Sequence, residues 1–517
     1  MRRALVIAVT RLGDLIQTEP MLRALRRSGS ADHVTLLVEK SFLPVARLLN
    51  GADEIFDIDF EPLLGGLDSR VSGLPLRDHA KLAAWLADSA FDVVFNLTHT
   101  RPSMVMSRLT GNTVQGVTLD NDGSQVVRNP WLQYFFATNL ARPWSSFNLI
   151  DVYVNAVEPA VDFNSRLPQV GKPAFGRSVN RWQDAEIVIH AGASQSDKQW
   201  PLNRFVELSD LLLDRGARVT LIGGKRSSEI SSAFPVHKYF TDRMGQTSVE
   251  DLQSLFANAS LLVSADSGPV HVAAASGLPI IAIEGGSAHG FETAPYMEGS
   301  YVIQPHLDQV LERIPNKTVT SASAERVTVE TVMSLIESHF DQHMQFIDSP
   351  GCSIYRTAGS ADIPGLELVS VSGEHKRYDQ WQSVLRRVWW SVIGLRGRTA
   401  ENNTSVLSRS FDDARKSAHD IYAASADVKR LASRASALSS AEHALAKELL
   451  KHPPLHHVNH FLQIARASVG GESISEMAAE LESLYGRFHE AVRELQPLLK
   501  ATSTFDFIKS HHKEAVL

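Results

Sequence analysis

The sequence predicts an α/β fold of two Rossmann-like lobes that face a cleft, followed by an α-helical C-terminal domain. Two stretches alternate short apolar runs with helical periods, and a stretch rich in proline and glycine separates them. The last third instead shows heptad spacing, and 517 residues are too many for one core. We therefore expect an N-terminal lobe over 1–165, a linker over 166–186, a C-terminal lobe over 187–345 and a helical module over 346–517.

The N-terminal lobe begins with a strand in "ALVIAV", followed by a helix through "LIQTEPMLRALRRSG". Further strands are expected in "HVTLLVE", "EIFDID" and "FDVVFNL", with a helix near Phe42 to Leu49. Strands that alternate with helices predict a parallel sheet covered on both faces. The linker is expected where "SRLPQVGKPAFGRSVNRWQDAE" loses this periodicity.

The C-terminal lobe repeats the alternation. Strands are expected in "EIVIH", "RVTLIGG", "LLVSAD" and "LPIIAIEGG". Helices are expected from Leu202, near Val249 to Ala257, and through "PVHVAAASG", where the glycine would end the helix. Two such lobes joined by a linker leave a cleft between them.

The C-terminal module is predicted from two stripes of residues spaced by threes and fours. Small side chains dominate the first stripe, so a partner helix could approach closely, and the second could supply that partner, although an intermolecular coiled coil is the alternative. The first stripe comprises Leu407, Phe411, Ala414, Ala418, Ile421, Ser425, Val428, Ala432 and Ala435, and the second Ile474, Met477, Leu481, Leu484, Phe488, Val492 and Leu495.

Two segments of the module have open roles. "LRRVWWSVIGLRGR", Leu385 to Arg398, could lie at a headgroup interface, pack across the lobes or present Trp389 and Trp390 to a partner. In "KHPPLHHVNH", His456 and His460 stand four apart, as helix-borne metal ligands do. The segment has no carboxylate or cysteine and contains two prolines, so we favour a polar interhelical loop over a metal site.

Composition narrows the class of protein. The chain is 44% hydrophobic and 21% charged with a net charge of -7, so it is globular and has no general attraction to nucleic acid. The single cysteine, Cys352, excludes an intramolecular disulfide framework and suits a reducing cytoplasm. No 18 consecutive residues are apolar, so membrane contact would be peripheral at most.

Two segments of the C-terminal lobe point to phosphate binding. In "VIHAGASQSDKQWP" a strand opens into Ala193 and Ser194, and Lys198 adds a positive charge. In "SADSGPVHVAAASG" the chain turns at Ser267 and Gly268 into a helix, whose first N–H groups and dipole would attract an anion. The alternative is that Ser267 or Asp266 only caps this helix.

The corresponding edge of the N-terminal lobe offers a carboxylate. "AVTRLGDLIQTEP" has one glycine, Gly13, and no G-x-G-x-x-G, so a dinucleotide there is not expected. Asp14 follows the first strand at the edge where ligands bind in open α/β sheets. It could be the N-cap of the next helix, a group facing the cleft, or both. Arg101, in "NLTHTRPS", could hold an anionic acceptor or lie solvated in a loop.

These motifs, with "LIGG" and "MGQTSVEDL" in the same order, resemble glycosyltransferase family 9, the ADP-heptose lipopolysaccharide heptosyltransferases, over roughly residues 1 to 345. The resemblance implies a GT-B fold, a nucleotide-sugar donor on the C-terminal lobe and an acceptor on the N-terminal lobe. It also implies inversion at the sugar, without a metal ion or another cofactor.

The resemblance also implies roles for individual residues. Asp14 falls on the catalytic aspartate, and the acceptor would meet Arg11, Gly13 and Arg101. His271 could face the donor or simply pack in its helix. The nucleotide-sugar residues would be Ala193, Ser194, Lys198, Gly223, Gly224, Met244, Asp266, Ser267, Gly268 and His271.

Two departures leave parts of the donor open. Lys225 and Arg226 follow "LIGG" where the family places an acid or another ribose-facing group. Glu284-Gly285-Gly286 replaces an aromatic residue and a Gly-Pro turn. ADP remains the favoured nucleotide, and the identity of the donor sugar is left open.

The resulting hypothesis is a cytoplasmic, inverting, metal-independent glycosyltransferase that moves a heptose-like sugar to a hydroxyl. Since the family's lipopolysaccharide enzymes are complete at about the length of residues 1 to 345, the added module would select the acceptor. This favours a protein over lipopolysaccharide. A non-catalytic adaptor and a sugar-nucleotide epimerase are the alternatives, and a homo-oligomer is possible.

Overall fold

The computed structural model divides the chain into two compact units. Unit 1 contains Met1–Leu132, Phe147–Leu307 and Val319–His375, and unit 2 contains Gln133–Ser146 and the helices from Lys376 onward. The segment Gln133–Ser146, which the sequence pattern assigned to the N-terminal lobe, therefore belongs to unit 2. The structure describes residues 1–9, 11–59, 74–110, 113–139, 141–159, 161–170, 181–192, 195–224, 228–306, 323–341, 347, 349–372, 376–394, 406–424, 428–468 and 474–491.

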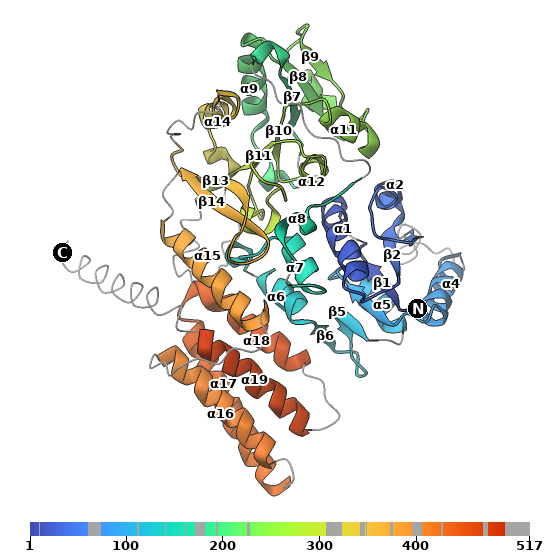
Figure 1. The fold of residues 1–517 in the computed structure, drawn as a ribbon, viewed down its shortest axis with the longest axis vertical. Helices are drawn as coiled ribbons and strands as arrows, with labels where there is room; N and C mark the ends of the chain where they lie inside the picture. The colour runs from blue at the N-terminus through green and yellow to red at the C-terminus, as the bar shows by residue number, and fades with distance from the viewer. Residues whose placement is uncertain are drawn as a thin grey trace, which may run out of the picture. The chain divides into compact units, whose positions relative to one another are not determined.

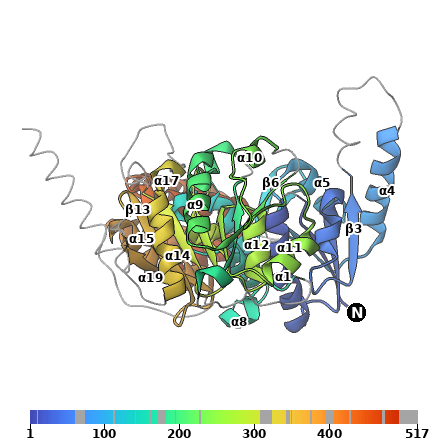
Figure 2. The same cartoon turned by 90° about the horizontal axis from the view of Figure 1, so that it is seen from above.

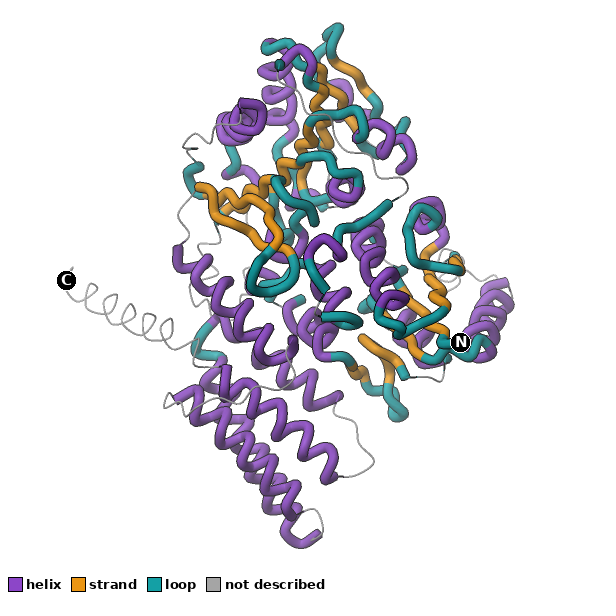
Figure 3. The backbone as a smooth tube through the Cα atoms, in the orientation of Figure 1, coloured by secondary structure: helices purple, strands orange, loops and turns teal. Residues whose placement is uncertain are grey.

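The strands of unit 1 gather in two separate groups (Figure 3). The first sheet has the order β3-β2-β1-β4-β5-β6 and is parallel except for the β5–β6 pair. Its elements, with the helices of the same region, are β1 Arg3–Ile7, α1 Leu12–Arg27, β2 His33–Glu39, α2 Leu43–Ala46, β3 Glu54–Ile58, α4 Leu74–Asp88, β4 Val93–Asn96, α5 Arg101–Leu109, β5 Val114–Leu119, β6 Gln125–Arg128, α6 Pro130–Thr138, α7 Leu149–Asn155 and α8 Phe163–Arg166.

The second sheet has the order β14-β13-β12-β11-β10-β7-β8-β9 (Figure 1). Strands β7 to β12 pair in parallel, as the alternating pattern predicts, and β13 and β14 add antiparallel pairs at one edge. The elements are β7 Glu186–His190, the 3-10 turn η4 Ser196–Lys198, α9 Leu202–Asp214, β8 Arg218–Ile222, α10 Ser228–Ser232, β9 Phe240–Asp242, α11 Val249–Phe256, β10 Leu261–Ala265, α12 Gly268–Ala275, β11 Ile280–Ile283, α13 Gly290–Thr293, β12 Tyr301–Pro305, α14 Val329–Asp341, β13 Cys352–Gly359 and β14 Leu366–Ser372.

The sheet therefore extends past residue 345, where the sequence predicted the helical module to begin. In β13 the first four residues are all buried, and the strand pairs with β12 through five residues. An antiparallel hairpin covers the backbone groups that β12 would otherwise leave unpaired at its edge. Part of the predicted linker, 171–180, lies outside the described residues.

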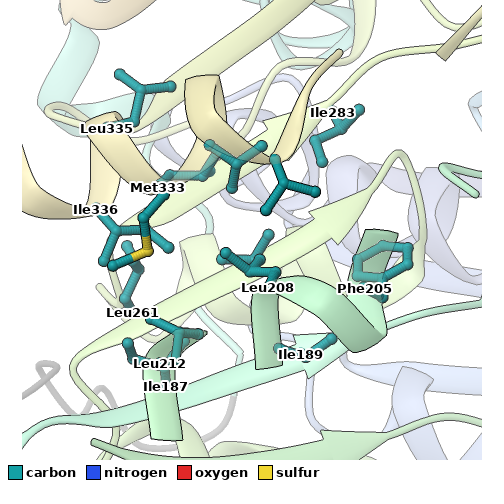
Figure 4. Packing of buried hydrophobic residues seen from close by; sticks show 14 of the residues in the cluster. Ile187, Ile189, Phe205, Leu208, Leu212, Leu261, Ile283, Met333, Leu335 and Ile336 are labelled. Atoms are coloured by element: carbon teal, nitrogen blue, oxygen red, sulfur yellow. The ribbon is translucent and has the colours of Figure 1, made fainter. Parts of the chain in front are cut away.

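The core of the second lobe packs one face of the sheet against helices α9 and α14. Figure 4 shows side chains of β7, β10 and β11 meeting those of the two helices. Trp200 is fully buried, and its indole N–H donates to the carbonyl of Val327 at 2.8 Å. Burying one large apolar side chain contributes roughly 1.5–3 kcal/mol. This packing holds the ends of β7 and β10 in fixed positions.

Unit 2 is helical in its described part, apart from short connecting segments. Its helices include α15 Lys376–Trp389, α16 Val406–Ala424, α17 Val428–Leu449, α18 His456–Ser468 and α19 Ile474–Ala491. Helix α16 packs against both α17 and α19. The pairing of the two predicted stripes is thus seen between α16 and α19. Of the first stripe, Ser425 lies outside the described residues, and Ala435 lies exposed on α17.

The structure also shows where Trp389 and the histidine-rich segment of unit 2 lie. Trp389 is buried, with its ring 4.9 Å from the rings of both Tyr134 and Phe461, so it does not face a membrane or a partner. His456 begins helix α18, so His456 and His460 lie on a helix and not in the predicted loop. Among the described residues, no group of three or more His, Cys, Asp and Glu side chains is arranged to hold a metal ion. No helix in the described part of the chain is long and apolar enough to span a membrane.

Candidate active site

The N-terminal lobe presents Asp14 in the first turn of α1. The N-cap of this helix is Arg11, whose extended backbone makes no side-chain capping bond. Asp14 is two residues into the helix from Leu12, so the prediction that it could be the N-cap is wrong. A carboxylate here still interacts favourably with the positive end of the helix dipole.

Asp14 lines a small pocket on this lobe. The pocket is lined by Ala8, Arg11, Asp14, Leu15, Thr18, Leu97, Thr98 and Tyr153. Arg11 is exposed, Asp14 is half-buried and Tyr153 is buried, so polar groups are present at several depths. The Thr98 hydroxyl accepts from the backbone N–H of Val9 at 3.1 Å, which ties the ends of β1 and β4 together. An entering hydroxyl group would meet Asp14 and Tyr153 here.

Tyr153 is a polar residue of this pocket that sequence reasoning missed. It comes from α7, whose sequence "LIDVYVN" is an entirely buried run and carries no signal of a site. Burial raises the pKa of the Tyr153 phenol well above its usual value, and the negative charges of Asp14 and Glu292 raise the pKa further. The phenol therefore stays neutral and keeps a proton that it can donate.

The first turns of α1 and α12 lie side by side (Figures 1 and 2). A Cβ added to Gly13 would lie 2.9 Å from Cδ2 of His271, and one added to Gly268 would lie 2.9 Å from Cδ2 of Leu12. Both positions therefore need glycine for the helices to approach this closely. The meeting of two helix N-termini concentrates positive potential next to Asp14.

The end of β10 carries a buried ion pair. Lys198, in η4, places its Nζ 2.7 Å from Oδ2 of Asp266, and both residues are less than one-tenth exposed. Burial lowers the pKa of the nearby His271, while the Asp266 charge raises that pKa and the Lys198 charge lowers it. His271 is therefore a neutral side chain, and its Nε2 lies 3.4 Å from Nε2 of Gln17. The structure thus brings Lys198, Asp266 and His271 together with the start of α1.

Ser267 is the N-cap of α12, but its side chain makes no capping bond. Its hydroxyl lies 3.1 Å from Nδ1 of His190 and 3.0 Å from the hydroxyl of Ser264. The alternative that the Ser267 side chain only caps the helix is therefore wrong. His190, the last residue of β7, is a second residue that sequence reasoning missed, although it directly precedes the glycine and small residues that suggested the site.

The turn after β8 brings three further predicted residues together. The carbonyl of Gly223 accepts from the N–H of Gly245 at 2.8 Å, and a Cβ on Gly223 would lie 2.6 Å from Sδ of Met244. Gly224 has open space where its side chain would be. Ala193 and Ser194, together with Lys225 and Arg226, lie outside the described residues.

Arg101 is the first residue of α5 and is exposed. The pocket beside Asp14 is lined by Leu97 and Thr98 of the same loop but not by Arg101. The helix is capped by Thr100, whose hydroxyl accepts from the N–H of Ser103. The structure therefore does not bring Arg101 into the Asp14 pocket.

The combined arrangement supports one kind of chemistry. A carboxylate beside a pocket can accept a proton from a hydroxyl. A lysine and a helix N-terminus on the facing element can stabilise negative charge on a departing phosphate. The carboxylate and the phosphate-stabilising groups lie at neighbouring helix starts. One substrate could therefore give up a proton to the carboxylate while another substrate loses a phosphate.

Comparison with known proteins identifies a matching family model and several relatives. Residues 79–313 match the family model of glycosyltransferase family 9 (heptosyltransferase). Lipopolysaccharide heptosyltransferase 3 of Escherichia coli (strain K12) is 24% identical over 304 residues, which cover 54% of this chain and 81% of that protein. Lipopolysaccharide heptosyltransferase 2 of the same strain is 32% identical over 113 residues, which cover 21% of this chain and 32% of that protein.

A solved structure supports the fold. The crystal structure of the glycosyl transferase family 9 from Veillonella parvula DSM 2008 superposes with a TM-score of 0.50 at 18% sequence identity. The match covers 66% of this chain and 98% of that one. The prediction of a GT-B fold with two lobes is thereby confirmed, and about one third of this chain has no counterpart in that structure.

Proposed function

We propose, from the premise that the chain is a glycosyltransferase of family 9, that it moves a heptose from a nucleoside diphosphate to a hydroxyl group. ADP is the favoured nucleotide, as the resemblance in sequence implies. The observation that carries the proposal is the contact between the starts of α1 and α12. Asp14 lies in the first turn of α1, and α12 follows Asp266, the ion-pair partner of Lys198.

On the donor side, the diphosphate would lie at the N-terminus of α12. The N–H groups of its first turn and Lys198 would bind the phosphates, and Asp266 orients the lysine through their 2.7 Å contact. These groups would stabilise the negative charge that grows on the diphosphate as the bond to the sugar breaks. Because a lysine and a helix dipole supply the positive charge, the proposal includes no metal ion.

On the acceptor side, Asp14 would act as the general base. It would accept the proton of the acceptor hydroxyl while the hydroxyl oxygen attacks the anomeric carbon. The diphosphate leaves from the opposite face of the sugar, so one displacement inverts the anomeric centre. Arg11 and Gly13 adjoin the same helix turn and would contact the acceptor, whereas Arg101 could act only at a distance from the pocket.

We further propose that the acceptor is a protein hydroxyl, with lipopolysaccharide as the second candidate. The match to lipopolysaccharide heptosyltransferase 3 covers 54% of this chain, and the helices of unit 2 give the chain a surface for selecting a larger acceptor. We place the enzyme in the cytoplasm, a reducing compartment that a chain with one cysteine, Cys352, suits.

The first experiment is a thermal-shift screen of nucleotides and nucleotide sugars against the full chain, since a ligand of the native state raises the melting temperature. Donors that bind are then incubated with protein and lipopolysaccharide acceptors, with and without EDTA, and the products are identified by mass spectrometry. Addition of a heptose to an acceptor hydroxyl is expected. An isomerised donor of unchanged mass, or no turnover with any donor that binds, would contradict heptosyl transfer.

The role of unit 2 needs an experiment on the intact chain. Truncation after Arg398 would remove Phe461 and Phe488, whose rings lie 4.9 and 5.5 Å from that of Trp389, and would leave this tryptophan partly uncovered. A photo-crosslinking residue at Ala437, exposed on α17, tests acceptor contact without that disruption. Crosslinks to the acceptor are expected, and none at Ala437 or its exposed neighbours Ala435 and Ser436 would argue against contact through α17.

A further inference from the structure

The site contains a buried hydrogen-bonded cluster to which the reaction above gives no role. His190 ends β7, Ser264 lies in β10, and Ser267 starts α12. Nδ1 of His190 lies 3.2 Å from the Ser264 hydroxyl and 3.1 Å from the Ser267 hydroxyl, and the two hydroxyls are 3.0 Å apart. His190 is 8% exposed. The cluster therefore joins two strand ends to the first turn of the helix at the donor site.

The direction of each hydrogen bond follows from counting protons. The Ser264 hydroxyl donates to the carbonyl of Ala265 at 2.7 Å, and a carbonyl oxygen can only accept. The single proton of Ser264 is then in use, so its oxygen can bond to His190 only as an acceptor. Nδ1 of His190 is then the group that can donate to the Ser264 oxygen, and we assign the ring proton to Nδ1, shared between the two serine oxygens. Burial lowers the pKa of His190 to about 4, so near neutral pH the ring is neutral and Nε2 has no proton.

This arrangement points the Ser267 proton at the Ser264 oxygen 3.0 Å away, because Ser264 has no proton left for that bond. The Ser264 oxygen also accepts from His190, so it keeps a partner when the Ser267 proton turns to a bound phosphate oxygen. Ser267 adjoins Asp266, which holds Lys198. The Ser267 hydroxyl thus lies at the N-terminus of α12, where the phosphates of the nucleotide sugar are proposed to lie.

We propose that His190 is a positioning residue of the donor site: it donates from Nδ1 to Ser267 and so directs the Ser267 proton toward a phosphate oxygen of the leaving diphosphate. The inference rests on the proposed function for the identity of the ligand, but not for the hydrogen bonds. His190 touches no reacting atom. It acts through Ser267, and its effect disappears when the Ser267 hydroxyl is absent.

A double-mutant cycle on the full chain tests this coupling, with ADP and pyrophosphate as calorimetric probes. Loss of one hydrogen bond to the ligand should weaken binding by about 2- to 10-fold in Ser267→Ala. His190→Leu should weaken binding by a similar factor, and the double variant should bind no more weakly than Ser267→Ala alone. His190→Asn, whose amide N–H can replace Nδ1–H, should restore most of the affinity.

Two results would overturn the inference. Additive losses in the double variant would show that His190 acts independently of Ser267. A nitrogen NMR spectrum of the wild-type protein with the His190 proton on Nε2 would remove the donor, and this measurement holds even if His190→Leu does not fold. Failure of the wild-type protein to bind either probe would also count against the inference. Probe binding without heptosyl transfer would contradict only the proposed function.

Discussion

Nζ of Lys198 lies 2.7 Å from Oδ2 of Asp266, and both side chains are buried. The pair joins the turn after β7 to the turn after β10, which lie next to each other because β7 and β10 are neighbouring parallel strands. The group proposed to bind the donor is thus held in place by a second charge.

Lys198→Ala should weaken binding of ADP by about 10- to 100-fold, because a hydrogen bond to a charged group contributes about 1.5–3 kcal/mol. It should also destabilise the fold by about 3–5 kcal/mol, since it leaves the Asp266 carboxylate buried without its partner. Calorimetry and denaturant unfolding measure the two effects. The control is the double variant that carries Asp266→Asn in addition to Lys198→Ala. It should recover the stability of the fold without recovering the affinity for ADP. Unchanged affinity in Lys198→Ala would rule out its role in phosphate binding.

Asp14→Asn should reduce turnover by 10²- to 10⁴-fold, the range typical of general-base loss. Donor affinity should stay close to that of the wild type, because the change adds no bulk and removes no positive charge. The melting temperature should change little, since Arg11 and not Asp14 is the N-cap of α1. Steady-state rates with a thermal melt check both points. A variant with a near wild-type rate would show that Asp14 is not the base.

Tyr153→Phe should move the acid limb of the kcat/KM profile to higher pH. The base must be ionised, so activity is lost once the pH is low enough to protonate the Asp14 carboxylate. A neutral phenol lining the same pocket can donate to that carboxylate and favour its charged form, so removal of the hydroxyl should make Asp14 easier to protonate. The raised pKa of Tyr153 keeps the phenol neutral across this range.

Tyr134→Phe is the matched control for Tyr153→Phe. Its buried hydroxyl accepts from the N–H of Ser146 at 2.7 Å within unit 2, so its loss should lower stability and leave the acid limb unchanged. An acid limb that coincides in Tyr153→Phe and wild type would mean that the phenol does not act on Asp14.

Unit 2 should lose stability on mild acidification because of His457. This imidazole accepts from Nε1 of Trp389 at 2.8 Å, and burial, with the nearby His460 and His456, lowers its pKa to about 3. The unfolded chain binds a proton below about pH 6.5 and the folded chain does not, so stability falls as the pH drops from about 6.5 toward 3.

The free energy of unfolding should fall by up to about 1.4 kcal/mol for each pH unit in that window. Denaturant unfolding followed by tryptophan fluorescence measures it, and His457→Gln should flatten the dependence because it does not titrate. Equal slopes in the variant and the wild type would assign the acid sensitivity to other groups.

The sequence by itself determined the two-lobed fold and predicted where a site would lie within it. Hydrophobic periods of two and of three to four residues are local properties, so β1, α1, β7, β10 and α12 could be predicted from the runs that form them. Carboxyl ends of parallel strands collect at one edge of a sheet, which placed Asp14, Lys198 and the Ser267-Gly268 turn at ligand-binding edges. Gly277, with φ of +71°, ends α12 as its position predicted.

Only the tertiary structure decided which of these groups meet and what their side chains do. His190 and Tyr153 come from buried, apolar runs whose patterns predict core, and their proposed roles depend on residues 77 and 139 positions away in the chain, Ser267 and Asp14. The packing of α16 against α17, which divides the first stripe between two helices, depends on contacts between separate segments, and so does the hairpin that extends the second sheet beyond residue 345. Local propensity is a property of neighbouring residues, whereas these contacts form only after the chain has brought remote segments together.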